Sequence, residues 1–254
     1  MGLVDNTAVR HAVAAFAARP EQRTALEVLR QCMFGELLLD TTGSDAPQNG
    51  TFAAGSNLQI NGGTGPDGGR ALFAFTRQEE IARRYPPNVR TQSLVTSAVG
   101  AVELVRNQGS SWLYIDPAGP TCALAANEID FALRNPRNER LKQALVAFGT
   151  GQLDRRGVVD ALLQDEAMLI AADDRTVPGQ IGVRTAVLPD GSPAMLGFTS
   201  GPEVLAYNPD DAVSPQTVGK VLDIMRRDGH HGLVIDPAGP WIALSRAEID
   251  ESLR

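Results

Sequence analysis

The chain has 254 residues, 43% of them apolar and 21% charged, which is typical of a soluble globular protein with one large domain or two ordinary ones. Its net charge of −7 argues against nucleic acid or an anionic membrane as the main partner, because both attract a positive surface. Cys32 and Cys122 form neither a disulfide framework nor a metal-type spacing. No apolar run approaches the ~20 residues that span a bilayer, and no secretory signal is visible, so we expect a cytoplasmic protein without membrane insertion.

The hydrophobic pattern of the first half predicts helices alternating with short strands. The spacing of Val9, Val13 and Phe16 indicates a first helix, and the run Leu37-Leu38-Leu39 indicates a buried strand. In chain order we expect helices at about 5–18, 24–31, 77–85, 93–107 and 127–134, and strands at about 37–39, 58–60, 71–76, 112–115 and 122–124. Small polar residues at 41–57 predict a loop.

The second half repeats this order. Ile-Asp-Pro-Ala-Gly-Pro occurs at 115–120 and again at 235–240, each time after an apolar run and before a Glu-Ile-Asp. We therefore predict an α+β protein made of two tandem repeats of one domain, each a small mixed sheet flanked by helices. The first copy would span 1–135, with an inserted loop at about 43–57, and the second 136–254, because Pro136 interrupts the preceding helix.

Several features of each half together resemble the N-terminal domain of bacterial SseB-family proteins. They are a strand ending in Phe-Thr (Phe75-Thr76 and Phe198-Thr199), a short acidic helix, a longer helix, an apolar strand with a Pro-x-Gly-Pro turn, and a closing Glu-Ile helix. The resemblance covers most of both halves and departs from the family at Asp116 and Asp236, where Asn is common. It implies an α+β domain without established catalytic residues. It also implies a link to an enhanced-serine-sensitivity phenotype and to secretion, neither of which supplies a mechanism.

Residues 63–68, Gly-Thr-Gly-Pro-Asp-Gly, match the pattern G-x-G-x-x-G. A dinucleotide site needs a helix that begins inside this pattern, so that helix N–H groups meet the pyrophosphate. Here the predicted strand at 71–76 follows, and the second half has the same Pro-Asp-Gly turn without the upstream glycines. We expect a hairpin loop at 63–68, and no cofactor.

The repeated turns and their surroundings are the candidate partner or ligand surface. One interpretation makes Asp116 and Asp236 the carboxylates of two like ligand loops. The other, which we favour, has each Asp capping its own turn as an Asx-turn that the prolines stiffen. The candidate residues are Asp116, Pro117, Gly119, Asp236, Pro237, Gly239, Trp241, His230 and His231.

The histidines and cysteines have structural interpretations that we favour. His230 and His231 are adjacent, so on a strand their side chains point to opposite faces and cannot easily share one metal. We expect them to lie in solvent at the start of a strand, and we expect no metal. Cys122 aligns with Ile242 and is expected to be an inert core thiol.

The two tryptophans mark a difference between the halves, because Trp112 aligns with Gly232 and Trp241 with Thr121. Either both fill an interface between the halves, or Trp241 is exposed as an anchor for a partner.

No reaction constellation is present: a G-x-S-x-G elbow is missing, and the many carboxylates are the solvated charges and caps of an ordinary protein. We therefore expect a non-catalytic interaction module, acting as an adaptor, chaperone-like or regulatory protein on an unidentified protein partner. It would be a monomeric pseudo-dimer or a homodimer. The alternative is a small-molecule sensor with a site between the two halves, and a hydrolytic or transferase enzyme ranks third.

Overall fold

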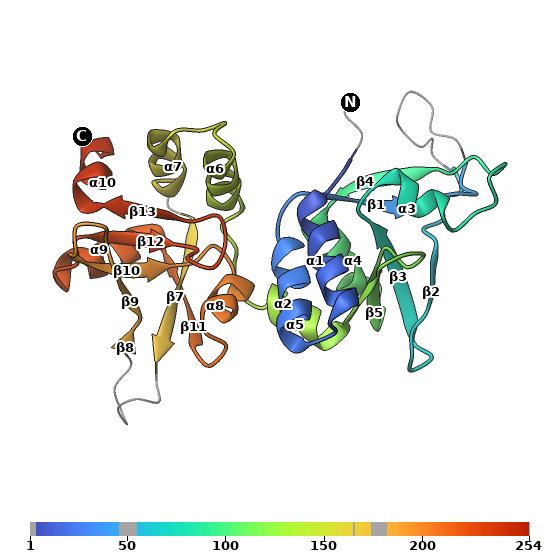
Figure 1. Ribbon diagram of the computed structural model, residues 1–254, viewed down its shortest axis with the longest axis horizontal. Coiled ribbons are helices and arrows are strands. Elements are labelled where there is room, and N and C mark those ends of the chain that lie inside the picture. Colours follow the sequence, from blue (N-terminus) through green and yellow to red (C-terminus); the bar gives the residue numbers. More distant parts are fainter. Residues whose placement is uncertain (1–3, 46–54, 165, 174–181, 254) are drawn as a thin grey trace. The chain divides into compact units, whose positions relative to one another are not determined.

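The computed structural model describes residues 4–45, 55–164, 166–173 and 182–253 (Figure 1). The chain divides into two compact units, residues 1–130 and 131–254. The division falls inside the helix that closes the first repeat, a few residues before the predicted seam at 135–136. In the part of the chain that is described, no helix has the length and apolar character needed to cross a membrane.

The first unit contains one mixed sheet. Its strands lie in the order β4-β1-β3-β5-β6, and the short strand β2 pairs with β3 outside this order. The β3–β5 pair is parallel, and the other pairs are antiparallel. The elements are α1 (Thr7–Ala18), α2 (Gln22–Gln31), β1 (Glu36–Asp40), β2 (Gly62–Thr64), β3 (Arg70–Phe75), α3 (Gln78–Ala82), β4 (Ser93–Ser97), α4 (Ala98–Asn107), β5 (Trp112–Ile115), β6 (Cys122–Ala125) and α5 (Ala126–Leu133).

The second unit repeats this topology. Its strands β13-β12-β10-β9 and β11-β7-β8 form two ladders, and a bridge between Leu169 of β7 and Phe198 joins them into the order β11-β7-β10-β12-β13. Two α+β repeats, each with a mixed sheet, are therefore confirmed. The elements are α6 (Glu139–Gly149), α7 (Arg155–Leu162), β7 (Ala167–Asp173), β8 (Gly182–Val183), β9 (Thr185–Val187), β10 (Pro193–Gly197), α8 (Gly201–Tyr207), β11 (Ala212–Thr217), α9 (Val218–Arg227), β12 (Gly232–Ile235), β13 (Ile242–Ser245) and α10 (Arg246–Ser252).

Three local predictions can be compared with these elements. The helix predicted over 93–107 is wrong in its first turn and a half: residues 93–97 form β4, and Ser97 then caps α4 by accepting from the Gly100 N–H at 3.0 Å. The strand predicted at 58–60 is also displaced, to β2 at 62–64. The hairpin predicted at 63–68 is confirmed, because β2 and β3 pair antiparallel around it. Of the predicted loop, residues 46–54 lie outside the described part.

Each sheet buries both faces. In the second unit, one face packs its apolar side chains against α6, α7, α9 and α10, and the other packs against α8 through Phe198 and Val204. In the first unit, Leu38, Phe75 and Ile81 form the counterpart of this smaller core.

The two cysteines belong to the apolar interior. Cys122 and Cys32 are fully buried, and burial raises the pKa of both thiols, that of Cys122 to about 12. A thiol that cannot ionise is a poor nucleophile. Cys122 therefore lies in the core, as predicted, and its inertness toward thiol reagents stays a prediction.

Candidate functional site

Both repeated turns start from a residue with a left-handed backbone. Asp116 and Asp236 have φ of 53° and 48°, a conformation that Asp tolerates better than most residues. The turn closes when the Gly119 N–H donates to the Asp116 carbonyl at 3.1 Å, and the Gly239 N–H does the same to Asp236 at 2.9 Å. The two tight turns are thus built alike.

The aspartate side chains do not form the expected Asx-turns. Asp116 accepts from the Thr76 N–H at 2.9 Å and from the Thr76 hydroxyl at 2.7 Å. Asp236 accepts from the same two groups of Thr199, at 2.8 and 2.6 Å. Each carboxylate therefore ties together the carboxyl ends of two parallel strands, β3 with β5 and β10 with β12. The Asx-turn prediction is wrong because the left-handed backbone aims the side chain across the sheet.

These carboxylates are buried: Asp116 is 2% exposed and Asp236 is 0% exposed. Pro117, Gly119, Pro237 and Gly239 are half-buried. The rims of the turns reach the surface, but the aspartate side chains do not.

A second buried carboxylate accompanies each aspartate, and the two units neutralise it differently. In the first unit, Glu80 accepts from Arg77 at 2.8 Å and from Arg83 at 2.6 Å, and both arginines reach in from the solvent side. A Cβ on Gly119 would lie 2.9 Å from a terminal nitrogen of Arg83, so the turn packs directly on this ion pair.

In the second unit, one lysine serves both carboxylates. The Lys142 ammonium donates to Glu203 at 2.5 Å and to Asp236 at 2.8 Å, and all three side chains are buried. Lys142 lies on α6 four residues after the cap Asn138, at the position that Arg10 occupies after the cap Asn6 of α1. Arg10 pairs instead with Asp5 near the surface.

This difference changes the proton affinity of the clusters. Burial, together with repulsion from Glu80, raises the pKa of Asp116 to about 6, although the Thr76 hydrogen bonds and Arg77 oppose the shift. Burial alone would lower the pKa of Lys142, but the attraction of Asp236 and Glu203 outweighs it and the pKa is raised. Lys142 therefore stays charged, while Asp116 titrates close to neutral pH.

The buried clusters join the ends of neighbouring strands. Neither of the two surface pockets described next is lined by Asp116, Glu80, Asp236 or Glu203. In the described part of the chain, no group of three or more His, Cys, Asp or Glu could hold a metal ion. His230 is half-buried, and among the described residues its Nδ1 has no hydrogen-bond partner, whereas His231 is exposed.

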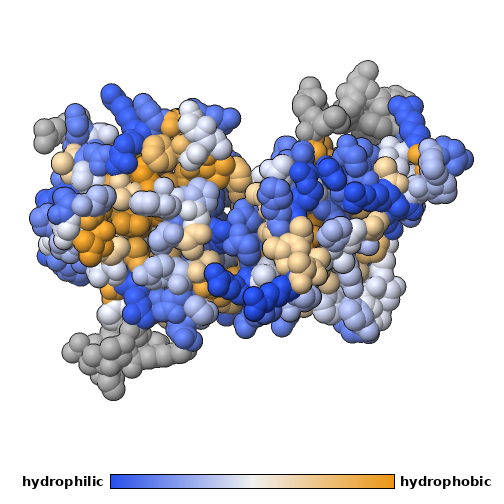
Figure 2. Space-filling view, in the orientation of Figure 1, coloured by the Kyte–Doolittle hydropathy of each residue, from blue (hydrophilic) through white to orange (hydrophobic). Residues whose placement is uncertain are grey.

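Trp241, at the end of the second turn, stands beside an apolar groove of about 540 Å³. Its side chain is 56% exposed, which is what the partner-anchor interpretation of this residue requires. Figure 2 shows broad apolar surface, in orange, on the second unit. The groove is lined by Phe148, Leu188, Pro189, Ile242 and Ala243, with Arg155, Asp190, Ser245 and Glu248 at its polar margin.

Charged side chains held by hydrogen bonds also line this groove. Arg155 donates to Glu248 at 2.8 Å and to the Ala243 carbonyl at 2.6 Å, and the Arg155 bond contributes most to lowering the pKa of Glu248 to about 2. Asp190 accepts from the Ser192 hydroxyl and N–H, which lower the pKa of its carboxyl. Asp190 is therefore an ionised group in the lining of the groove; within the described residues it pairs with no Lys or Arg, and the charge of His231 also lowers its pKa.

The first unit does not repeat this anchor. Thr121 stands where Trp241 stands in the second copy, and its hydroxyl donates to the Ile115 carbonyl at 2.9 Å within the turn. Trp112 is half-buried and donates to Asp67 at 2.8 Å. The exposed tryptophan thus belongs to the second copy.

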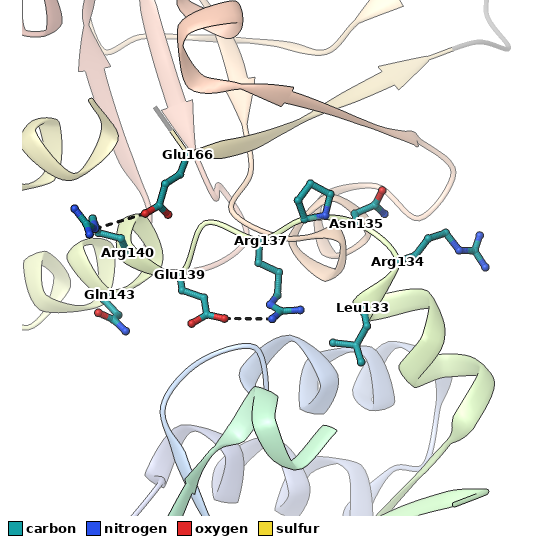
Figure 3. A pocket seen from close by; sticks show the side chains of 9 residues that line it. Leu133, Arg134, Asn135, Arg137, Glu139, Arg140, Gln143 and Glu166 are labelled. Atoms are coloured by element: carbon teal, nitrogen blue, oxygen red, sulfur yellow. Dashed lines mark hydrogen bonds and ion pairs between the residues drawn. The ribbon is translucent and has the colours of Figure 1, made fainter. Parts of the chain in front are cut away.

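A second, polar pocket of about 560 Å³ lies where the second unit begins (Figure 3). Arg137 pairs with Glu139 at 3.2 Å, and Arg140 pairs with Glu166 at 3.6 Å. The other lining residues are Leu133, Arg134, Asn135, Pro136 and Gln143. Ligand sites are mostly apolar with a few polar groups, and this pocket has the opposite balance.

Glu80, Glu203 and Lys142 were not predicted from the sequence. Aligning the two halves places Glu80 opposite Glu203, each five residues after the Phe of the Phe-Thr pair, and that repetition was the available signal. Nothing local marks Lys142, because its partners lie 61 and 94 residues away.

The comparisons with known proteins agree with this duplicated architecture. The family model described as SseB protein N-terminal domain matches residues 9–130 and again residues 141–251. Neither the search of curated proteins nor the search of solved structures found a significant match.

Proposed function

The chain belongs to the SseB family, with two tandem copies of its N-terminal domain, and we propose that it is a non-catalytic protein-interaction module whose second copy holds the partner. The observation that carries this proposal is Trp241, a large aromatic side chain 56% exposed at the edge of an apolar groove. Tryptophan in such a setting is the residue type that most often dominates binding free energy at protein interfaces.

The groove also defines the chemistry of the partner. Its floor accepts an apolar side chain, and the ionised Asp190 at its mouth favours a basic residue beside that side chain. The partner is therefore a protein segment with an aliphatic or aromatic residue next to Lys or Arg.

The test starts from partners captured from the native cell by the purified chain, followed by a measured affinity for each purified partner. Replacing Trp241 with Ala is expected to weaken binding by about 2 kcal/mol, or roughly 30-fold in Kd. The Leu253→Ala variant removes an apolar side chain of similar exposure, 54%, that does not line the groove, and should bind as the original chain does.

Partners that bind equally well to the Trp241→Ala variant would refute the proposal. The volume of the groove also lies in the range of small-molecule sites. A thermal-shift screen with metabolites separates that alternative, because a ligand of the folded state raises the melting temperature.

A further inference from the structure

The two repeats end their sheets with equivalent edge strands, β4 in the first unit and β11 in the second. Each leads directly into a helix that its last residue caps: Ser97 accepts from the Gly100 N–H and Thr217 accepts from the Lys220 N–H. Counting back from these caps, Val95 of β4 occupies the position of Pro215 in β11.

The register shows which main-chain groups face outward. In the first unit, the Thr41 N–H donates to Gln92 and the Ala98 N–H donates to Gly35, so the even-numbered residues of β4 bond β1. The main chain of Ser93 and Val95 therefore points away from the sheet. Within the described residues, no hydrogen bond reaches the N–H or carbonyl of Val95 from that side.

The same argument explains Pro215. The Val218 N–H donates to Glu166, so Ser214 and Gln216 bond β7, and the nitrogen of Pro215 faces the open edge. Proline there removes a donor from the middle of the open edge and so interrupts any further ladder, a common protection of edge strands. The second copy is thus blocked at the position where the first copy is open.

Other edge strands are short or have outward main-chain groups that side chains bond. The β6 strand has four residues, and its Ala125 N–H donates to Glu128. In β13, the Ala243 carbonyl is bonded by Arg155 and the Ser245 N–H by Glu248. The β2 and β9 strands are three residues long. By contrast, β4 has five residues, Ser-Leu-Val-Thr-Ser, without a charge or a proline, and its Val95 side chain is 42% exposed.

We propose that β4 pairs antiparallel with β4 of a second copy of this chain, about a twofold axis at Val95. The strand is self-complementary: this register sets Val95 opposite Val95 and Ser93 opposite Ser97. The stretch from Thr91 to Val102 contains no charged residue, so this pairing places no like charges opposite each other. The contact is isologous, which closes the assembly at a dimer.

The dimer is weak and reversible. A ladder of five residues buries much less than the roughly 1,200 Å² of a stable protein interface, so β4 pairing alone corresponds to association at high micromolar concentration. This inference concerns the first copy and does not depend on the groove beside Trp241.

Sedimentation velocity of the full chain, from low micromolar to near-millimolar concentration, measures this association. We expect a monomer–dimer equilibrium, with amide exchange at residues 93–97 slowing as the concentration rises. The Val95→Pro variant has no N–H at the position where β11 has Pro215, so it should raise the dimer dissociation constant at least about tenfold.

Two further variants complete the design. Val95→Lys places two ammonium groups at the twofold axis and should also abolish the dimer, which covers the case that Val95→Pro fails to fold. Val187→Lys adds the same charge at a more exposed valine, 69% exposed on β9, and should leave the dimer unchanged. A chain that stays monomeric at every concentration, or a dimer that survives both Val95 variants, overturns the proposal.

Discussion

The buried lysine of the second unit provides the sharpest test of how the two copies differ. In the Lys142→Met variant, Glu203 and Asp236 would stay in the interior and lose the buried ammonium group that both contact. Removing one partner of a buried ion pair costs about 3–5 kcal/mol, because it leaves uncompensated charge away from water. Total unfolding free energies are about 5–15 kcal/mol, so the second unit would lose a large part of its stability.

The repeat supplies the matched control. Arg10→Met removes the cation at the same helical position of the first unit, but Arg10 pairs with Asp5 at a side-chain exposure of 24% and 47%. Exposed pairs contribute about 0–1 kcal/mol, so this variant should be nearly as stable as the original chain.

Urea denaturation followed by far-ultraviolet circular dichroism measures both variants. The chain has two tryptophans, so a Trp241→Phe background leaves Trp112 as a fluorescent reporter of the first unit, whose transition should not move in the Lys142→Met variant. Because the pKa of Lys142 is raised, its contribution is complete below the pKa of the unfolded lysine and is lost as pH rises through the folded pKa. It is therefore fully present at pH 7.

Equal small effects of Lys142→Met and Arg10→Met would refute the reasoning that the buried cation stabilises the second unit.

Two further predictions concern the interior of the first unit. The pKa of Asp116 is raised from 3.8 to about 6, so the folded state binds more protons than the unfolded state in that window and the unfolding free energy falls as pH rises through it, by up to about 3 kcal/mol. Asp116→Asn should remove this dependence; equal pH profiles of the two proteins between pH 4 and about 7 would contradict the assignment. Cys32 and Cys122 should resist a thiol reagent at pH 8 in the folded chain and react fully in denaturant, because burial keeps both thiols protonated; rapid labelling of the native chain would show that they are accessible.

The order of elements in each repeat could be predicted from the sequence, because it depends on local patterns. The strand predicted at 112–115 coincides with β5, and the helix predicted at 24–31 falls within α2. The boundary before α4 failed because Leu94 and Val95 fit both a helical spacing and a strand alternation, and only pairing with β1 separates the two.

The role of the repeated turn could not be predicted, because it depends on which strand ends meet. Asp116 reaches Thr76 across 40 residues, and Asp236 gains Lys142 across 94. Identical six-residue segments thus acquire different electrostatics from distant, non-identical neighbours, and only the tertiary structure brings those neighbours into contact.

The same reason applies to the two surfaces proposed here. The sequence alone shows that Trp241 aligns with Thr121, but not that its side chain is exposed beside a groove. That Val95 corresponds to Pro215, and that this position faces an open sheet edge, follows from the helix caps and the strand register. The sequence determined the duplication of the domain; burial and strand register, which follow only from packing, decided where the two copies differ.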